Sequence, residues 1–432
     1  MLKMRLFMKS FFLAAAGAIA LAGCQSSASI GNIPGTSSGA HTAASVVGSA
    51  SRTLGGKFGF NGAEDAGIDH VSVSDLCDEV YDPMRAKCFG YRTLDAIRTT
   101  AYPTPTNGLE AYDLSTLYTF PSLDQQANSG MGSQQVVGIV VAFSYPNLES
   151  DLAAYRNYYR MPTCNVANGC LKIINVAPAS VTSTATSAYS ISANPTTNIG
   201  GWAAEADADT QVVSATCRNC KIIVAQAATD SLADLGRAVR AADSAGATVI
   251  NASFGAKEDA GQVALESTFV DSPRNVKLVA ATGDSGPGVY FPAASTKAIA
   301  VAGTSLAVSG TTLAESLWNG SGYGCSAIFA KPSWQVGSCP RRSVADVAAV
   351  ADPYTGIWIY SSIAGGWSVI GGTSVAAPIV AGLEALSGNS LAGIGASRLY
   401  TNRNQFLPVV NISNTNGDVA TGLGVPQGLG GF

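Results

Sequence analysis

Charged residues are scarce in this 432-residue chain, where 25 basic and 29 acidic side chains make up 12% of the sequence. Soluble domains typically carry about 25% charged residues. No basic run interleaved with aromatic residues occurs and the formal net charge is −4, so the sequence excludes an electrostatic surface for nucleic acid. Hydrophobic residues make up 47% of the chain, which supplies a large core and excludes a disordered protein.

Histidine is also nearly missing, because the chain has only 2, His41 and His70. Both precede the part of the sequence that has regular structure patterns. Their position argues against a zinc site at the Cys-x-x-Cys of residues 217–220, for which a structural disulfide is the better interpretation. It also argues against a Ser-His-Asp triad of the kind that subtilisin-like enzymes use.

A second long apolar run is absent after the N-terminus. At the N-terminus, three basic residues precede an apolar stretch at 11–22, which is shorter than the roughly 18 residues that a membrane span needs. The stretch ends in Leu-Ala-Gly-Cys, which resembles the lipobox of bacterial lipoproteins. We therefore expect residues 1–23 to be a signal peptide and Cys24 to be lipidated, with an ordinary signal peptide as the alternative. Gln25, by the same resemblance, favours the outer membrane.

Cysteine usage agrees with export from the cytoplasm. Nine cysteines less Cys24 leave eight, an even number as expected in an oxidising compartment. Proximity in the sequence suggests four disulfides, which would join Cys77 to Cys88, Cys164 to Cys170, Cys217 to Cys220 and Cys325 to Cys339.

The rest of the chain divides into three parts. Residues 24–62 are rich in Ser, Ala, Gly and Thr and are typical of a flexible tether. Residues 63–101 form a short lead-in segment of unknown role, and residues 102–432 form the main domain. In that domain continuous β-branched runs predict strands buried on both faces, as in a parallel sheet. These runs are Val136–Phe143, Lys221–Ala227, Thr248–Phe254, Lys277–Gly283, Lys297–Gly303 and Ile357–Tyr360.

Helical patterns lie between several of these strands. Residues 231–244 begin with Ser and place apolar residues at helical spacing, and a second helix covers about 210–216. Strands that alternate with helices predict an α/β fold, a doubly wound and mostly parallel sheet flanked by helices.

Three motifs carry candidate chemistry. Ser374 follows Gly-Gly-Thr and precedes small residues, so it is expected at the N-terminus of a helix, where free N–H groups favour developing negative charge. Glu205 and Asp209 are four residues apart and share one face of a helix, which raises the pKa of one carboxyl. Asp284 follows the strand that starts at Lys277 and is placed to point into a site at the carboxyl edge of the sheet.

Each motif also has an ordinary structural interpretation. Ser374 can be a helix N-cap, the acidic pair can lie on a solvated helix face, and Asp284 can be a turn residue. Gly-Asp-Ser-Gly at 283–286 also occurs around the nucleophile of chymotrypsin-like enzymes, which would implicate Ser285. The chain lacks their all-β pattern and a suitably placed histidine, so we reject Ser285 as the nucleophile.

In combination and in this order, the motifs resemble those of the sedolisins, the serine-carboxyl peptidases, from about residue 104 to the end. The resemblance implies a subtilisin-like fold and endopeptidase action on polypeptides. It also implies a role for each of the four residues. Ser374 would be the nucleophile, Glu205 its general base and acid, Asp209 the residue that orients Glu205, and Asp284 the oxyanion donor. A carboxylate base and a protonated Asp284 both favour an acidic optimum.

The calcium loop that usually closes a sedolisin is matched only in part. Asp418 fits its second carboxylate, whereas Phe406 is followed by apolar residues where the first carboxylate would stand. A ligand set with one carboxylate binds Ca²⁺ poorly, so Asp418 is a candidate calcium ligand in an incomplete set, and no cofactor is expected for the chemistry. We expect a monomer, anchored by lipid, that acts on polypeptides. The alternative is a catalytically silent sedolisin-like lipoprotein that binds peptides or envelope partners.

Overall fold

The computed structural model describes residues 50–53, 72–93, 108–178, 199–309, 312–391, 395–409 and 420–432. All of them belong to one compact unit, residues 45–432. The expected signal peptide, Cys24 and Asp418 lie outside the described residues.

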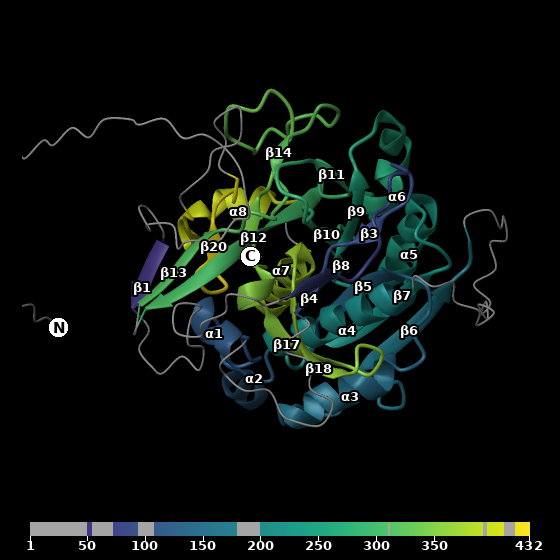
Figure 1. The fold of residues 1–432 in the computed structure, drawn as a ribbon, viewed down its shortest axis with the longest axis vertical. Helices are drawn as coiled ribbons and strands as arrows, with labels where there is room; N and C mark the ends of the chain where they lie inside the picture. The colour runs from purple at the N-terminus through teal and green to yellow at the C-terminus, as the bar shows by residue number, and fades with distance from the viewer. Residues whose placement is uncertain are drawn as a thin grey trace, which may run out of the picture. The chain divides into compact units, whose positions relative to one another are not determined.

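A mostly parallel sheet forms the centre of this unit (Figure 1). Its strand order is β1-β13-β12-β10-β8-β5-β7-β6, and β16 also pairs with β12. The neighbours from β6 to β12 run parallel, as does β16, whereas β13 and β1 are antiparallel. Its strands are β1 (Ala50–Thr53), β5 (Val136–Ala142), β6 (Leu171–Val176), β7 (Lys221–Ala227), β8 (Val249–Ala252), β10 (Lys277–Ala281), β12 (Ala298–Ser309), β13 (Thr312–Leu317) and β16 (Val347–Val350).

Smaller antiparallel sheets surround the central one. Their strands are β2 (Val73–Asp75), β3 (Lys87–Cys88), β4 (Tyr91–Thr93), β9 (Phe254–Lys257), β11 (Tyr290–Phe291), β14 (Gly324–Cys325), β15 (Ser343–Val344), β17 (Ile357–Ser361), β18 (Gly366–Gly371), β19 (Phe406–Leu407) and β20 (Val425–Pro426).

Two predicted strands differ from the structure. The run Thr248–Phe254 is divided at Ser253 into β8 of the central sheet and β9 of a small sheet. The run Ile357–Tyr360 forms β17, which pairs antiparallel with β18 and not within the central sheet. Helices α3 and α4 contact β17, so its side chains are buried although the strand is not parallel. A continuous apolar run therefore indicates that a strand is buried on both faces, but it does not distinguish a parallel from an antiparallel strand.

Helices lie on both faces of the central sheet. Helix α5 packs on β5 and β7, while α4 and α7 pack against each other and against β5, β8, β10 and β12. The helices are α1 (Asp113–Leu117), α2 (Leu123–Ser129), α3 (Leu148–Tyr158), α4 (Ile199–Thr216), α5 (Leu232–Ser244), α6 (Glu266–Val270), α7 (Thr373–Ser387) and α8 (Ser397–Thr401). The doubly wound α/β prediction is therefore confirmed. In the described part of the chain, every helix is too short or too polar to cross a membrane.

Local sequence signals explain where these helices begin and how closely they pack. The Ser231 side chain caps α5 by accepting a hydrogen bond of 3.2 Å from the backbone N–H of Asp234. A Cβ atom on Gly382 of α7 would lie 2.6 Å from Cβ of Thr216 on α4. Glycine at this position therefore lets the two helices approach each other.

The four cysteine pairs suggested by proximity are all disulfides in the structure. The bonds join Cys77 to Cys88, Cys164 to Cys170, Cys217 to Cys220 and Cys325 to Cys339. Proximity in the sequence was thus a sufficient guide to the pairing, because each bond closes a short loop.

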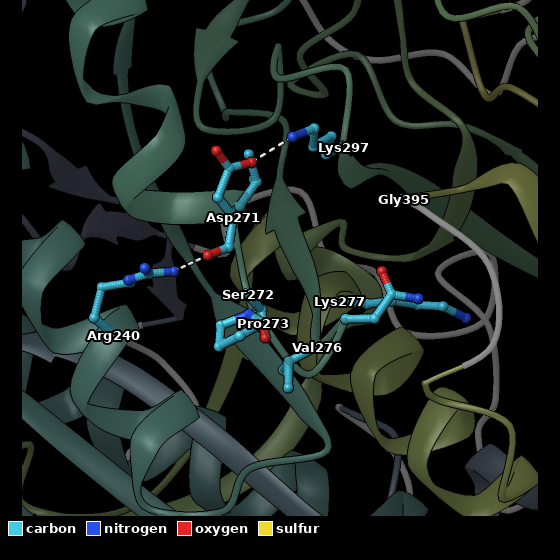
Figure 2. Close-up of a pocket in the computed structure, with 10 residues that line it drawn as sticks. Arg240, Asp271, Ser272, Pro273, Val276, Lys277, Lys297 and Gly395 are labelled. Carbon is cyan, nitrogen blue, oxygen red and sulfur yellow. Dashed lines mark hydrogen bonds and ion pairs between the residues drawn. The ribbon is translucent and has the colours of Figure 1, made fainter.

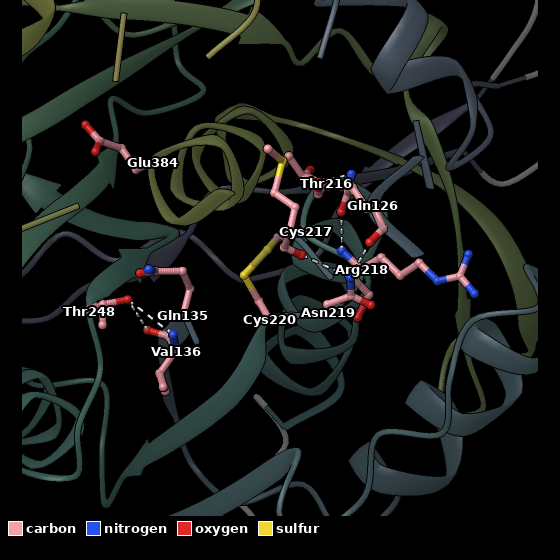
Figure 3. The surroundings of a disulfide bond; sticks show 12 residues. Gln126, Gln135, Val136, Thr216, Cys217, Arg218, Asn219, Cys220, Thr248 and Glu384 are labelled. Atoms are coloured by element: carbon pink, nitrogen blue, oxygen red, sulfur yellow. Dashed lines mark hydrogen bonds between the residues drawn. A yellow bond between two sulfur atoms is a disulfide. The ribbon is translucent and has the colours of Figure 1, made fainter. Parts of the chain in front are cut away.

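Each disulfide closes a turn or loop next to a regular element. Figure 3 shows the bond of Cys217 with Cys220, which closes the turn after α4. Inside that turn, the backbone N–H of Arg218 donates to Oε1 of Gln126 at 2.9 Å. Cys170 directly precedes β6, and the bond to Cys339 starts from β14. The disulfides fit a protein that folds outside the reducing cytosol.

A buried ion pair joins the central sheet to α7. Nζ of Lys277 lies 3.0 Å from Oε2 of Glu384, and both side chains are almost fully buried. Burial raises the pKa of Glu384, and the charge of Lys277 opposes that shift. Lys297 and Asp271 form a comparable pair at the surface (Figure 2).

We expect Lys277→Met to lower the free energy of unfolding by about 3 kcal/mol, because it leaves the Glu384 carboxylate buried without its partner. Lys297→Met removes a half-exposed cation and should change stability by less than about 1 kcal/mol. Chemical denaturation with the disulfides intact measures both values. Equal effects of the two substitutions would contradict the structural role of the buried pair.

Candidate active site

Helix α4 brings two carboxyl groups to the centre of the molecule. Glu205 and Asp209 lie one turn apart and are fully buried. The residues around them are mostly alanine, at positions 203, 204, 206 and 208. These small side chains leave room for α7 to pack against the helix. The pair therefore lies in the interior, and the solvated acidic face weighed from the sequence is excluded.

Ser374 occupies the first turn of α7, as its sequence motif predicts. Gly372, at the N-cap, has φ of 107°, a conformation that glycine adopts without strain. The backbone N–H of Ser374 donates to the carbonyl oxygen of Phe89 at 2.9 Å. The Ser374 hydroxyl donates to the carbonyl oxygen of Ser253 at 3.1 Å. The serine is fully buried at the N-terminal end of the helix.

A polar residue at the end of β8 holds Asp209. The Ser253 hydroxyl donates to Oδ1 of Asp209 at 2.6 Å and itself accepts a hydrogen bond of 2.9 Å from Nδ2 of Asn251. Ser253 also approaches the carbonyl oxygen of Ser374 at 3.3 Å. One hydroxyl therefore links the acidic helix to the backbone of the candidate nucleophile.

Asp284 follows β10, the strand next to β8. Its Oδ1 accepts hydrogen bonds from the backbone N–H of Thr373 at 2.8 Å and from the Thr373 hydroxyl at 2.7 Å. Its Oδ2 has no hydrogen-bond partner among the described residues. This free oxygen lies against Gly372, because a Cβ atom built there would be 2.5 Å from it. Asp284 therefore presents one carboxyl oxygen beside the N-terminus of α7.

Burial determines the protonation of these acids. It is the main cause that raises the pKa of Glu205 well above its ordinary value, and the charge of Asp209 adds to the effect while the Ser374 hydroxyl opposes it. Burial raises the pKa of Asp209 to about 8, against the hydrogen bonds from Ser253 and Asn251. Burial likewise raises the pKa of Asp284 to about 7, against those from Thr373. Asp284 is thus protonated in acid and can donate a hydrogen bond.

The structure brings the four residues singled out by the sequence, Ser374, Glu205, Asp209 and Asp284, into one buried cluster. Ser285, rejected from the sequence, is exposed. The motifs did not assign Asn251 and Ser253 to the site, although both follow from the rule that polar residues at the ends of neighbouring parallel strands meet at one edge. The arrangement holds a hydroxyl, a carboxyl pair and a carboxylic acid, the groups that acyl transfer needs.

A second buried acid on α4 lies apart from this cluster. Burial raises the pKa of Asp207 well above its ordinary value, and the charge of Asp151 adds to that shift. Asp151 accepts a hydrogen bond of 2.5 Å from the Tyr145 hydroxyl and one of 2.9 Å from the backbone N–H of Ser362. Asp207 therefore belongs to a separate group of buried polar side chains.

The chain is similar to known proteins over this region. The model of the subtilase family matches residues 175–396, about half of the chain. Kumamolisin of Bacillus sp. (strain MN-32) is 34% identical over 230 residues, which are 42% of this chain and 41% of that protein. Sedolisin of Pseudomonas sp. (strain 101) is 34% identical over 164 residues, 33% of this chain and 27% of that protein. The chain therefore matches less than half the length of these relatives.

A solved structure shares the fold. Pseudomonas sedolisin, a serine-carboxyl proteinase solved with two molecules of pseudo-iodotyrostatin, superposes with a TM-score of 0.58 at 23% sequence identity. The match covers 74% of this chain and 96% of that one. The subtilisin-like fold expected from the motifs is confirmed by this likeness.

The raised pKa values predict how stability depends on pH. Asp209 and Asp284 keep their protons in the folded chain up to about pH 8 and 7, whereas the unfolded chain releases them near pH 4. Their contribution to the free energy of unfolding is full below the pKa of the unfolded chain. It is lost as the pH rises through their pKa values in the folded chain. We expect the melting temperature of a Ser374→Ala chain to fall by about 5 °C or more between pH 4 and 8.

Asp209→Asn in the same background removes one titrating group and should weaken this dependence. Asp271→Asn, at the surface, serves as the matched control and should leave it unchanged. Calorimetry at several pH values measures both. A melting temperature that rises steadily from pH 4 to 8 would contradict protonated acids in the folded site.

Proposed function

This chain belongs to the subtilase family as a member of the sedolisin group, and we propose that it is a serine-carboxyl peptidase that hydrolyses polypeptides in acid. The observation that carries the proposal is the buried placement of Glu205 and Asp209 beside Ser374. Asp284 lies at the N-terminus of α7, the helix that carries Ser374. The same types of group, if they lay apart in the fold, would not supply a nucleophile, a base and an oxyanion donor around one point.

In the proposed mechanism Ser374 attacks the substrate carbonyl while Glu205 accepts its proton. Glu205 then gives that proton to the leaving amine, and a water molecule hydrolyses the ester in the reverse sequence. Two buried carboxyls so close do not both ionise, so the form of the pair that has lost one proton supplies the base, and Asp209 orients Glu205 in it. The hydrogen bond from Ser253 fixes Asp209 in this position.

The developing oxyanion would have two donors. One is the backbone N–H of Ser374, and the other is the protonated carboxyl of Asp284. The second donor exists only below the pKa of Asp284, which burial raises to about 7. Activity should therefore be lost as the pH rises through neutrality, which supports the acidic optimum expected from the sequence.

We further propose that the protein acts outside the cytoplasm, on a lipid anchor at Cys24. The four disulfides support an oxidising compartment. None of the proposed steps needs a metal ion, because the four residues supply the nucleophile, base and donors. Calcium at Asp418 stays a prediction. At the other expected ligand position the chain continues from Phe406 into Leu407 as strand β19, without a carboxylate.

We expect Glu205→Gln to lower kcat on an unfolded protein substrate at acid pH by roughly 10²- to 10⁴-fold, because it removes the general base. Asp207→Asn is the matched control: it is a buried acid on the same helix that lies outside the site, and kcat should change by less than about threefold. Circular dichroism verifies folding in both variants. Full activity of Glu205→Gln would rule out the carboxyl mechanism. Absence of hydrolysis by the native chain from pH 3 to 8 would favour a silent peptide-binding protein.

Asp284 should determine the alkaline limb of the pH profile. Asp284→Asn keeps an N–H donor that does not titrate, so the fall of kcat/KM with rising pH should move upward by about one pH unit or disappear. Asp284→Ala, which has no donor, should lose about 10²- to 10³-fold at every pH. An unchanged alkaline limb in Asp284→Asn would assign the titration to another group.

A further inference from the structure

Helix α4 has a second polar face, opposite the one that carries Glu205 and Asp209. Asp207, Gln211 and Ser214 follow one another at helical spacing and therefore share a face. A helix turns by about 100° per residue, so Asp207, two residues from each catalytic acid, is on the far side from both. This face brings a third buried acid to a different part of the fold.

The second face of α4 contacts helix α3 and the hairpin formed by β17 and β18. Nε2 of Gln211 donates to the carbonyl oxygen of Tyr360 at 2.6 Å, and Oε1 of Gln211 accepts the Tyr360 N–H at 2.8 Å. Gln211 thus pairs with the backbone of β17 as a neighbouring strand would. On α3, Nη1 of Arg156 donates to the Ser214 hydroxyl at 2.9 Å.

The end of the hairpin is fastened to α3 through Asp151. Its Oδ2 accepts hydrogen bonds from the Tyr145 hydroxyl at 2.5 Å, from the Ser362 N–H at 2.9 Å and from the Ser362 hydroxyl at 2.9 Å. Ser362 directly follows β17 and begins the turn to β18. Three donors on one oxygen favour the ionised form of a carboxyl group.

Asp207 lies beside Asp151 but lacks such donors. It is fully buried, and neither carboxyl oxygen has a hydrogen-bond partner among the described residues. The hydroxyls of Ser361 and Tyr145 oppose the rise of its pKa, but neither is in hydrogen-bonding geometry with it. A buried carboxyl group in these surroundings keeps its proton. The protonated group is itself a donor, and Asp151 is the acceptor within its reach.

The titratable groups that face Asp207 favour this arrangement. They are Asp151 on α3 and Tyr145 in the loop after β5, and none of the described groups that act on the pKa of Asp207 is a cation. Burial and the charge of Asp207 raise the pKa of Tyr145. The Tyr145 hydroxyl therefore keeps its proton and remains a donor to Asp151.

We propose that Asp207 and Asp151 share one proton and, with Tyr145 and Ser362, form an acid-operated clasp that fastens the β17–β18 hairpin to α3 and α4. Loss of the proton places two adjacent negative charges in the interior, where no cation balances them, so the hairpin separates from the helices. The clasp is a proton-binding site apart from the catalytic acids, and it does not depend on the proposed peptidase function.

The clasp connects the elements that carry the candidate nucleophile and base. Strand β18 ends at Gly371, and the chain continues through Gly372 into α7 with Ser374. Helix α4, on the other side of the clasp, carries Glu205. The clasp therefore holds these elements together in acid. Asp207→Asn keeps a donor to Asp151, so it leaves the clasp closed in acid, where it serves as the activity control.

The raised pKa of Asp207 determines the direction of the effect. Once the hairpin opens and admits water, that pKa returns to about 4. The stability that the clasp contributes is full below this ordinary value and is lost as the pH rises through the raised one. Between the two values, each pH unit increases the equilibrium constant for opening by up to about tenfold.

Hydrogen exchange followed by mass spectrometry measures the opening. The full chain carries Ser374→Ala to prevent self-digestion and is compared with and without Asp207→Asn at the same pH, which cancels the intrinsic pH dependence of exchange. An asparagine donates to Asp151 without titrating. The exchange rate of residues 357–371 with Asp207, relative to that with Asn, should therefore rise by at least about tenfold from pH 5 to 8. Peptides from α5 should show no such rise.

Two further variants in the same background separate the clasp from general stability. Asp271→Asn removes a surface carboxyl group and should leave the exchange of the hairpin unchanged at every pH. Tyr145→Phe removes one donor to Asp151 and should increase hairpin exchange at pH 5 by about tenfold. Its pH dependence should persist, because Asp207 still titrates.

Three outcomes would overturn the clasp. The same pH dependence of hairpin exchange with Asp207 and with Asn would show that the titrating group is another one. An equal change in the hairpin and in α5 would show that the whole molecule opens rather than the hairpin. An effect of Asp271→Asn as large as that of Asp207→Asn would remove the assignment to the buried pair. None of these outcomes bears on the peptidase function, which the hydrolysis assays test separately.

Discussion

The burial of three carboxyl groups around one serine is the constraint on which the rest of the structure depends. Isolated carboxylates are costly in an apolar interior, and such groups take up a proton instead. Glu205, Asp209 and Asp284 follow this rule, because burial is the main cause of each raised pKa. A site of this kind needs dry, tightly packed surroundings and hydrogen bonds that fix each acid in place. The sequence around it supplies both.

Dry surroundings come from the packing of α4 against α7. Alanine lines the acidic helix, and Gly382 lets α7 approach Thr216 closely. The hydrogen bonds come from polar residues at the ends of neighbouring strands, Ser253 after β8 and Asp284 after β10. Thr373 in turn holds one oxygen of Asp284 and leaves the other facing the N-terminus of α7. Helix packing thus keeps water from the three carboxyl groups, and sheet topology supplies the hydrogen bonds that hold them in place.

Much of this could be predicted from sequence because it depends on local patterns. Continuous apolar runs identified most strands of the central sheet, and the spacing of Glu205 and Asp209 placed them on one helix face. Interactions between distant segments could not be predicted in this way. The run that ends at Phe254 was divided at Ser253 because β9 leaves the sheet to pair with β3. The position of the lead-in segment in the cleft depends on the pairing of Lys87 with Gly255 and of Tyr91 with Gly371, for which no local pattern exists.

The lead-in segment and the buried acids also influence each other. While residues 72–93 cover the cleft, Ser374 and Glu205 are fully buried, and burial keeps the pKa of Asp284 near 7. On the proposed mechanism, the oxyanion donor is therefore already protonated in weak acid.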